Sequence, residues 1–456
     1  MNDRLQGVRG EEHGPRREIA AFTTSIDCQR EGRVPIAPNS GGSRARARAK
    51  RWLTRNPVLP KKIGLFGLFG SGNSGNDGSL EAMLMFLRRV RPDAELACIS
   101  PGPDKTGWNF GIPAFGANSC SSSKIVRLLN RLLFGGPRQF GNWVYTIRQV
   151  YKFDLLIIPG TGLLDDFGTG PWFIPYMLFR WCLSARLCRS QIWFVSVGAG
   201  PIHHPMSRRL MKWAAAMAQH RSYRDTISKE FMESVGVDVR SDRVYPDLAF
   251  RLLNPKPSRL GGAPLTVALG VMSYRGWRSD LEPRDELSEA YLKKLTRFLN
   301  WLLDRGYHVR ILTGDLSDQP AVDNLMMALT TERRSIEPEK LVAEPTPTLH
   351  DVMRQISLTD IVVATRFHNV VCALKLGKPT ISVGYANKND VLLADMGLAA
   401  FCQHIEELDV DLLIEQLTVL VADRHKHQQR IEKTVRAYYQ QLADQDVILA
   451  SKLLEL

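Results

Sequence analysis

The sequence lacks several features that would assign it to a common class of protein. No stretch is long and uncharged enough to cross a membrane: the most apolar one, 171–188, contains Pro175 and carries Arg180 and Arg186. Residues 1–20 include four arginines and no apolar core, so they do not predict a secretory signal. We expect 171–188 to form a helix buried against a sheet; interfacial contact with a lipid-linked substrate is the alternative.

Cysteine is scarce and has no recognisable spacing. The seven cysteines are scattered, mostly inside apolar runs, at positions 28, 98, 120, 182, 188, 372 and 402. No Cys-x-x-Cys or His-x₃-His pair suggests a metal site, and the adjacent His203 and His204 stand alone. The cysteines therefore indicate reduced core thiols of a cytoplasmic protein without a metal site.

Excess positive charge is concentrated at one end of the chain. The formal net charge is +13, but residues 1–62 hold 14 Lys/Arg against 6 Asp/Glu, which accounts for +8 and leaves +5 for the rest. The rest shows no alternation of aromatic and basic residues and no repeated recognition helix. We therefore expect no nucleic-acid partner; an anionic small substrate or an anionic membrane surface explains the charge equally well.

Residues 1–58 lack a hydrophobic period. They are rich in Arg, Gly, Pro and Ser and include the basic run 43–51. Such a segment buries too little apolar surface to offset the entropy lost on ordering, so we predict a basic, disordered tail. If this tail contacts anionic lipid, the protein would lie at the inner face of the plasma membrane.

The remainder alternates strand and helix patterns in two halves, and the length of 456 residues suits more than one domain. Short apolar, often β-branched runs predict strands at 62–67, 94–100, 154–158, 191–197, 265–271, 307–312, 360–364 and 380–385.

This alternation predicts an α/β protein with two doubly wound, Rossmann-like domains that face a cleft. The boundaries follow from the Pro- and Gly-rich linker at 253–262: an N-terminal domain at 59–255 and a C-terminal domain at 263–404. A mainly helical segment, 405–456, ends the chain. Residues 102–150 are rich in loops and Gly, and we expect them to form an insertion at the sheet edge.

Gly70, Gly72 and Gly75 fit the G-x-G-x-x-G pattern of dinucleotide-binding loops, but their context does not. The pattern is weak by itself, and it needs an acidic residue at the end of the following strand, where Ser100 stands. These glycines therefore do not predict a dinucleotide site.

The most informative stretch is 360–388. A buried strand at 360–364 leads into the turn 365–368, and an apolar helix follows. Ligands bind where a parallel strand ends and a helix begins, because the free N–H groups of the helix attract anions. Arg366 adds a fixed cation there, and His368 adds a titratable proton donor. A helix cap and a core histidine are the alternative interpretation.

This stretch resembles the polysaccharide pyruvyl transferase family. In that family an Arg-x-His turn is followed by Gly-x-Pro and by a Lys after the next strand, and here Arg366, His368, 377–379 and Lys388 match. Less specific matches lie in the first half: the loop 72–77, which has one extra Asn, the loop 160–164, the turn 198–201, Arg224-Asp225 and Pro246-Asp247. The resemblance covers most of 61–400 and implies the two-domain, GT-B-like architecture.

The resemblance also implies an activity: transfer of pyruvate from phosphoenolpyruvate to hydroxyls of a sugar in a cell-surface polysaccharide or glycolipid, forming a pyruvate ketal. Arg224, Arg366 and Lys388 would bind the carboxylate and phosphate of the donor, so neither a metal nor a cofactor is required. His368 would move protons, and Asp77 would deprotonate the sugar hydroxyl, with Asp165 as a less favoured choice. Substrate loops would contain Gly72, Asn73, Gly160, Gly162 and Asp165.

Two other functions remain open. The first is a GT-B nucleotide-sugar glycosyltransferase, whose C-terminal cations would bind a diphosphate. The second is a non-catalytic relative that binds glycan or membrane, which the departures from the family pattern at Pro159, Thr161 and Asn76 favour. The pair Arg224-Asp225 likewise has a plain alternative, a local ion pair beside a helix start.

Overall fold

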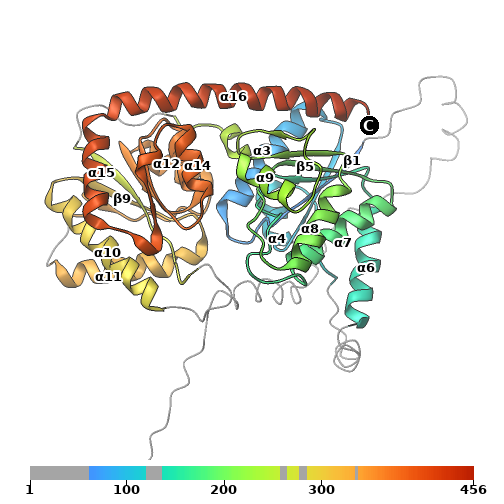
Figure 1. The fold of residues 1–456 in the computed structure, drawn as a ribbon, viewed down its shortest axis with the longest axis horizontal. Helices are drawn as coiled ribbons and strands as arrows, with labels where there is room; N and C mark the ends of the chain where they lie inside the picture. Colours follow the sequence, from blue (N-terminus) through green and yellow to red (C-terminus); the bar gives the residue numbers. More distant parts are fainter. Residues whose placement is uncertain (1–60, 120–135, 257–263, 277–284, 334–336) are drawn as a thin grey trace, which may run out of the picture.

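The computed structural model describes residues 61–119, 136–256, 264–276, 285–333 and 337–456. The predicted tail, 1–58, lies outside the described residues. The chain forms two α/β halves side by side, with one long helix, α16 (Arg424–Leu454), running across both (Figure 1).

The first half is built on a seven-stranded sheet in the order β3-β2-β1-β4-β5-β6-β7, and its strand pairs are parallel. Central strands such as β4 are buried at every position, as expected of a parallel sheet covered on both faces. Its strands are β1 (Lys62–Phe66), β2 (Glu95–Ser100), β3 (Ala114–Gly116), β4 (Leu155–Pro159), β5 (Gln191–Val197), β6 (His220–Tyr223) and β7 (Arg243–Val244).

Helices cover both faces of this sheet. Those of the first half are α3 (Ser74–Val90), α4 (Pro103–Phe110), α6 (Gly136–Val150), α7 (Ile174–Leu187), α8 (Pro205–Ala216) and α9 (Thr226–Ser234), followed by the 3₁₀ helix η2 (Leu248–Arg251). The stretch 102–150 does lie at the edge of the sheet, as expected, but β3 belongs to the sheet as its edge strand rather than to an insertion; residues 120–135 lie outside the described part of the chain. Helix α7 buries Met177, Leu178 and Trp181 in the core, which confirms the predicted buried helix.

The second half contains a six-stranded parallel sheet in the order β10-β9-β8-β11-β12-β13, which together with the first confirms the predicted pair of doubly wound sheets. Its strands are β8 (Thr266–Gly270), β9 (His308–Leu312), β10 (Leu341–Val342), β11 (Ile361–Ala364), β12 (Thr380–Gly384) and β13 (Cys402–His404). Its main helices are α10 (Asp285–Asp304), α11 (Gln319–Glu332), α12 (Leu349–Ser357), α13 (Phe367–Lys375), α14 (Lys388–Asp395) and α15 (Val410–Ala422).

Helix α16 returns from the second half and packs on the first (Figure 1). Leu442, Leu449 and Leu453 are buried in the same core cluster as residues of β1 and β5. The amide of Gln445 donates to Ser196 Oγ at 3.0 Å, and Arg89 forms an ion pair with Asp446 at 2.6 Å. The end of the chain therefore completes the core of its beginning.

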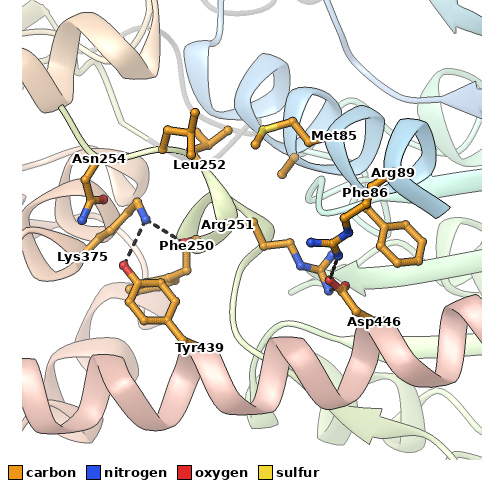
Figure 2. Close-up of a pocket in the computed structure, with 12 residues that line it drawn as sticks. Met85, Phe86, Arg89, Phe250, Arg251, Leu252, Asn254, Lys375, Tyr439 and Asp446 are labelled. Carbon is orange, nitrogen blue, oxygen red and sulfur yellow. Dashed lines mark hydrogen bonds and ion pairs between the residues drawn. The ribbon is translucent and has the colours of Figure 1, made fainter. Parts of the chain in front are cut away.

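A cavity of about 440 Å³ lies where α3, η2 and α16 meet (Figure 2). Within it, Lys375 Nζ donates to the Phe250 carbonyl at 2.7 Å and to the Tyr439 hydroxyl at 3.1 Å. Burial lowers the pKa of Lys375 to about 8. Arg251 pairs with Asp446 on the opposite wall. The charged groups of this cavity thus already have partners within the protein, and the bond from Lys375 to Phe250 joins the two halves. Among the described residues, no helix is long and apolar enough to cross a membrane.

Candidate functional site

The candidate site lies where the carboxyl ends of the strands of the two sheets approach each other. Its walls are joined by the connection between β1 and α3 and by residues 314–316 of the second half. Ser74 Oγ donates to the Gly314 carbonyl at 2.9 Å, and Asn73 forms an isolated bridge with Asp315. The predicted substrate-loop residues Gly72 and Asn73 thus contact the opposite half, and the Asn73 side chain also caps α3.

Three polar side chains from both halves converge at the centre of the site: Asp247 is buried, and the side chains of Arg224 and His368 are only 8% and 14% exposed. Asp247 uses Oδ1 to accept the Ala249 N–H at 2.9 Å, while its Oδ2 lies 3.7 Å from His368 Nε2 and 3.6 Å from Arg224 Nη1. Among the described residues, Asp247 Oδ2, His368 Nε2 and Arg224 Nε have no hydrogen-bond partner although each is buried. Because buried polar groups in native structures are nearly always paired, this cluster has the character of a site prepared for a ligand.

The imidazole of His368 rests against Gly75 in the first turn of α3. A Cβ atom on Gly75 would lie 1.8 Å from His368 Nδ1, so only glycine leaves room for the ring. Burial lowers the pKa of His368 to about 4; the Asp247 carboxylate opposes this shift, whereas Arg224 and Lys388 add to it. The ring is therefore uncharged at neutral pH and is ready to accept a proton.

The predicted cations Arg224 and Lys388 come together around one aromatic ring. The guanidinium carbon of Arg224 lies 4.5 Å from the centre of the Phe367 ring, and Lys388 Nζ lies 5.5 Å from it. Arg224 reaches this position across Gly198, where a Cβ atom would lie 2.5 Å from its Nη2. Asp225 caps α9 and also pairs with Arg224 at 3.4 Å, so the plain ion-pair interpretation holds alongside a role in the site.

Arg366 lies in the same region, but its guanidinium fork is already engaged. It donates from Nε to Asp318 Oδ2 at 2.9 Å and from Nη2 to Asp318 Oδ1. Asp318 is fully buried and also accepts the N–H groups of Ser273, Gly314 and Asp315. Arg366 therefore directs its fork at Asp318, whose carboxylate offsets its charge, and holds the 314–318 turn in place.

The loop after β4 brings a carboxyl group to the same edge. Asp165 Oδ1 accepts the Phe167 N–H at 2.9 Å. Burial raises the pKa of Asp165 to about 6, helped by Asp166 and opposed by Lys388. A Cβ atom on Gly162 would lie 3.9 Å from Arg224 Nη2, which places this glycine in the site, whereas Gly160 packs against α3.

Asp77, the predicted base, lies in the first turns of α3. Its Oδ1 accepts the Gly70 N–H at 2.7 Å, so the carboxylate anchors the preceding loop. Burial raises its pKa, the hydrogen bond from Gly70 and the charge of Lys105 oppose the rise, and nearby Asp315 adds to it. The structure does not decide whether Asp77 reaches a substrate hydroxyl, so its catalytic role stays a prediction.

Two residues of the site were not assigned a role from the sequence. Asp247 belongs to the Pro246-Asp247 turn, which matched the family pattern but was given no role in the site. Tyr385 directly follows β12, and Lys388 Nζ lies 5.2 Å from the centre of its ring. Burial would raise the pKa of Tyr385, but Lys388 and Arg366 outweigh it and lower the pKa below its usual value.

In the described part of the chain, no cluster of His, Cys, Asp and Glu is arranged to hold a metal.

Comparison with solved structures shows the fold. UDP-GlcNAc 2-epimerase from Neisseria meningitidis bound to UDP-GlcNAc matches with a TM-score of 0.54 and 12% identity, over 87% of this chain and 100% of that one. Alr3699/HepE from Anabaena, solved in complex with UDP and glucose, matches with a TM-score of 0.53 and 13% identity over the same shares. The two-sheet architecture is thus that of GT-B proteins.

Comparison with protein sequences shows the family. The amylovoran biosynthesis protein AmsJ of Erwinia amylovora is 20% identical over 325 residues, which cover 67% of this chain and 72% of AmsJ. The family model for polysaccharide pyruvyl transferase matches residues 73–387, a span that contains the site residues described above except Gly72 and Lys388, which lie directly beside its two ends. The chain therefore belongs to the polysaccharide pyruvyl transferase family.

Proposed function

We propose that this protein transfers pyruvate from phosphoenolpyruvate to two hydroxyls of a sugar in a cell-surface polysaccharide or glycolipid, forming a pyruvate ketal. Family membership and the likeness to a protein of amylovoran biosynthesis support a role in polysaccharide biosynthesis. The observation that carries the proposal is the convergence of Arg224, Asp247 and His368, whose unpartnered buried atoms lie beside Lys388.

The donor is a compact anion, and the site offers several groups that bind anions. Arg224 from the first half and Lys388 from the second would hold its carboxylate and phosphate. Helices α13 and α14 begin at Phe367 and Lys388 without a side chain that caps their first N–H groups, so their positive ends add to the attraction. Arg366, whose fork binds Asp318, would hold the adjoining turn in place rather than bind the donor.

The residues also suit the proton transfers of the reaction. In the first step the sugar oxygen bonds to C2 of the donor while C3 gains a proton and becomes a methyl group. Neutral His368, steadied by Asp247, would accept the hydroxyl proton, and Asp165, whose pKa is raised to about 6, is the carboxyl group best suited to protonate C3. In the second step phosphate leaves C2, the second hydroxyl oxygen bonds there, and its proton passes to phosphate. Asp77 stays the alternative proton acceptor.

Incubation of the full chain with phosphoenolpyruvate and bacterial glycan or glycolipid acceptors tests the proposal. We expect release of inorganic phosphate that depends on the acceptor, together with an acceptor heavier by one pyruvate ketal. UDP release from UDP-sugars without phosphate release would instead identify a glycosyltransferase. Glycan binding with neither product would identify a non-catalytic relative.

A further inference from the structure

Helices α6, α7 and α8 lie side by side over one face of the first sheet, and they contain cations but no acidic residue (Figure 1). Of their seven cationic side chains, only that of Arg180 is buried. The other six are Arg138, Arg148, Arg186, Arg208, Arg209 and Lys212. Over 136–224 the sequence has 11 Lys/Arg against 3 Asp/Glu, and two of the three acids, Asp165 and Asp166, are buried.

The same layer exposes large apolar side chains. Phe140, Ile147 and Tyr151 are 72%, 39% and 81% exposed, and their spacing of seven and four residues aligns them along one stripe of α6. Trp172 and Phe173, directly before α7, are 69% and 36% exposed. Leu187 at the end of α7 and Trp213 on α8 add to this set. Apolar and cationic groups therefore alternate over one layer of helices.

We propose that this outer surface of α6, α7 and α8 docks on an anionic lipid bilayer. Trp and Tyr side chains favour the boundary between lipid and water, and each Lys or Arg gains free energy near anionic headgroups. The surface has both, and no ion pair joins Arg148, Arg186 or Arg189 to a described residue. A second copy of the chain fits less well, because a symmetric dimer would place the same unpaired cations against one another.

The docked surface continues into the candidate site. Trp172 lies seven positions after Asp165, which corresponds to at most about 25 Å of extended chain. Asp165 in turn lies within the electrostatic reach of Lys388. If the proposed function holds, a sugar carried on a lipid would therefore be presented beside the cleft by the same contact that holds the protein at the membrane.

Vesicle binding of the full chain tests the docking independently of any activity. The probes are vesicles of phosphatidylcholine with or without phosphatidylglycerol. We expect binding to the anionic vesicles only, and a loss of roughly tenfold or more in R148E/R186E. The matched control is K426E/K433E on α16, which changes the net charge equally but should bind as the parent chain does. A second variant, F140S/Y151S, should also bind less, whereas M327S/V447S, which alters exposed apolar residues elsewhere, should not.

Thermal unfolding of each variant verifies that the fold is kept. Equal loss of vesicle binding in R148E/R186E and K426E/K433E would show that net charge or the basic tail is responsible for binding, and would overturn the proposal. Unchanged binding of the α6 and α7 variants would overturn it as well. A change in oligomeric state measured by sedimentation without lipid, with vesicle binding intact, would assign the surface to a second copy.

Discussion

At the scale of single residues, His368 is the group on which the proposed chemistry depends. Its ring is buried, its Nε2 faces Asp247 without a hydrogen bond, and its pKa is lowered to about 4 by burial. A histidine kept for packing alone would gain nothing from two nearby cations. The environment therefore suits a proton acceptor whose charged form is stabilised only when an anionic donor arrives.

The first prediction is that His368→Gln abolishes turnover while the fold and donor binding persist. Glutamine keeps the size and the hydrogen-bonding groups of the side chain but cannot take up a proton, so phosphate release should fall by about 10²–10⁴-fold. Phosphate release, phosphoenolpyruvate binding and the thermal midpoint should be measured on the same preparation. A folded variant with normal turnover would refute the mechanism, and a large loss in Asp77→Asn alone would move the role of base to Asp77.

Gly75 leads to a second prediction, because it provides the space for the His368 ring. Gly75→Ala places a Cβ atom where Nδ1 now lies, although alanine favours a helix by about 1 kcal/mol over glycine. We expect turnover to fall to the level of His368→Gln with no change in the fold. Gly141→Ala in α6 is the matched control, since its nearest neighbour would be 3.8 Å away. Full activity in Gly75→Ala would show that the ring position is not essential.

The third prediction is that removing the Arg366 side chain lowers the stability of the fold, whereas removing the Arg224 side chain lowers the affinity for the donor. Arg366→Ala leaves the fully buried Asp318 without its charged partner, so we expect a loss of about 3 kcal/mol in the free energy of unfolding. Arg224→Ala removes two long ion pairs, of 3.4 and 3.6 Å, and the contact with the Phe367 ring, and should instead weaken phosphoenolpyruvate binding by about 1.5–3 kcal/mol. Chemical denaturation and donor titration of both variants separate these effects. A stable Arg366→Ala that cannot bind donor would restore Arg366 as a direct ligand.

At the scale of helices and strands, the sequence pattern predicted those elements that depend on interactions between residues close together in the chain. The turn 365–368 was predicted at a strand end because apolar β-branched runs and helix periods are visible in the sequence. The role of β3 and α6 was not visible, because β3 is only three residues long and its place at the edge depends on pairing with β2. Asp247 could not be assigned either, since its partners Arg224 and His368 are far away in the sequence and meet it only after both sheets form.

Helix α16 carries the fourth prediction. Its sequence predicts a helix but not the half on which it packs. Leu449 is 1% exposed within the core that α16 shares with the first half, so Leu449→Ala should lower the free energy of unfolding by about 2–5 kcal/mol. Leu454→Ala, at a position that is 75% exposed, should leave it nearly unchanged. Equal stability of the two variants in denaturant would show that the end of α16 does not pack as described.

At the scale of the whole molecule, the two halves behave as one folded unit. The Ser74 contact to Gly314, the burial of Lys375 against Phe250 and the return of α16 each join them. The proposed site needs this union, because Arg224 and Asp247 come from one half and His368 and Lys388 from the other. Loss of packing at a distance should therefore reduce activity through the geometry of the site, even where no site residue is changed.

Acid sensitivity of the whole fold gives the last prediction. His220 is buried with Nε2 unpartnered among the described residues, and burial, with smaller effects from Lys452 and Arg221, lowers its pKa to about 4. Because the unfolded chain binds this proton near pH 6.5, it holds more protons than the folded chain between pH 6.5 and 4, so stability falls as the pH falls through that window. The free energy of unfolding should therefore fall by about 2–3 kcal/mol less between pH 7 and pH 4 in His220→Gln than in the parent chain. Denaturant unfolding at both pH values measures this difference. His425→Gln, at an exposed position on α16, is the control and should keep the parent dependence. If the free energy of unfolding depends on pH in the same way in the parent chain and in both variants, His220 is not held uncharged in the fold.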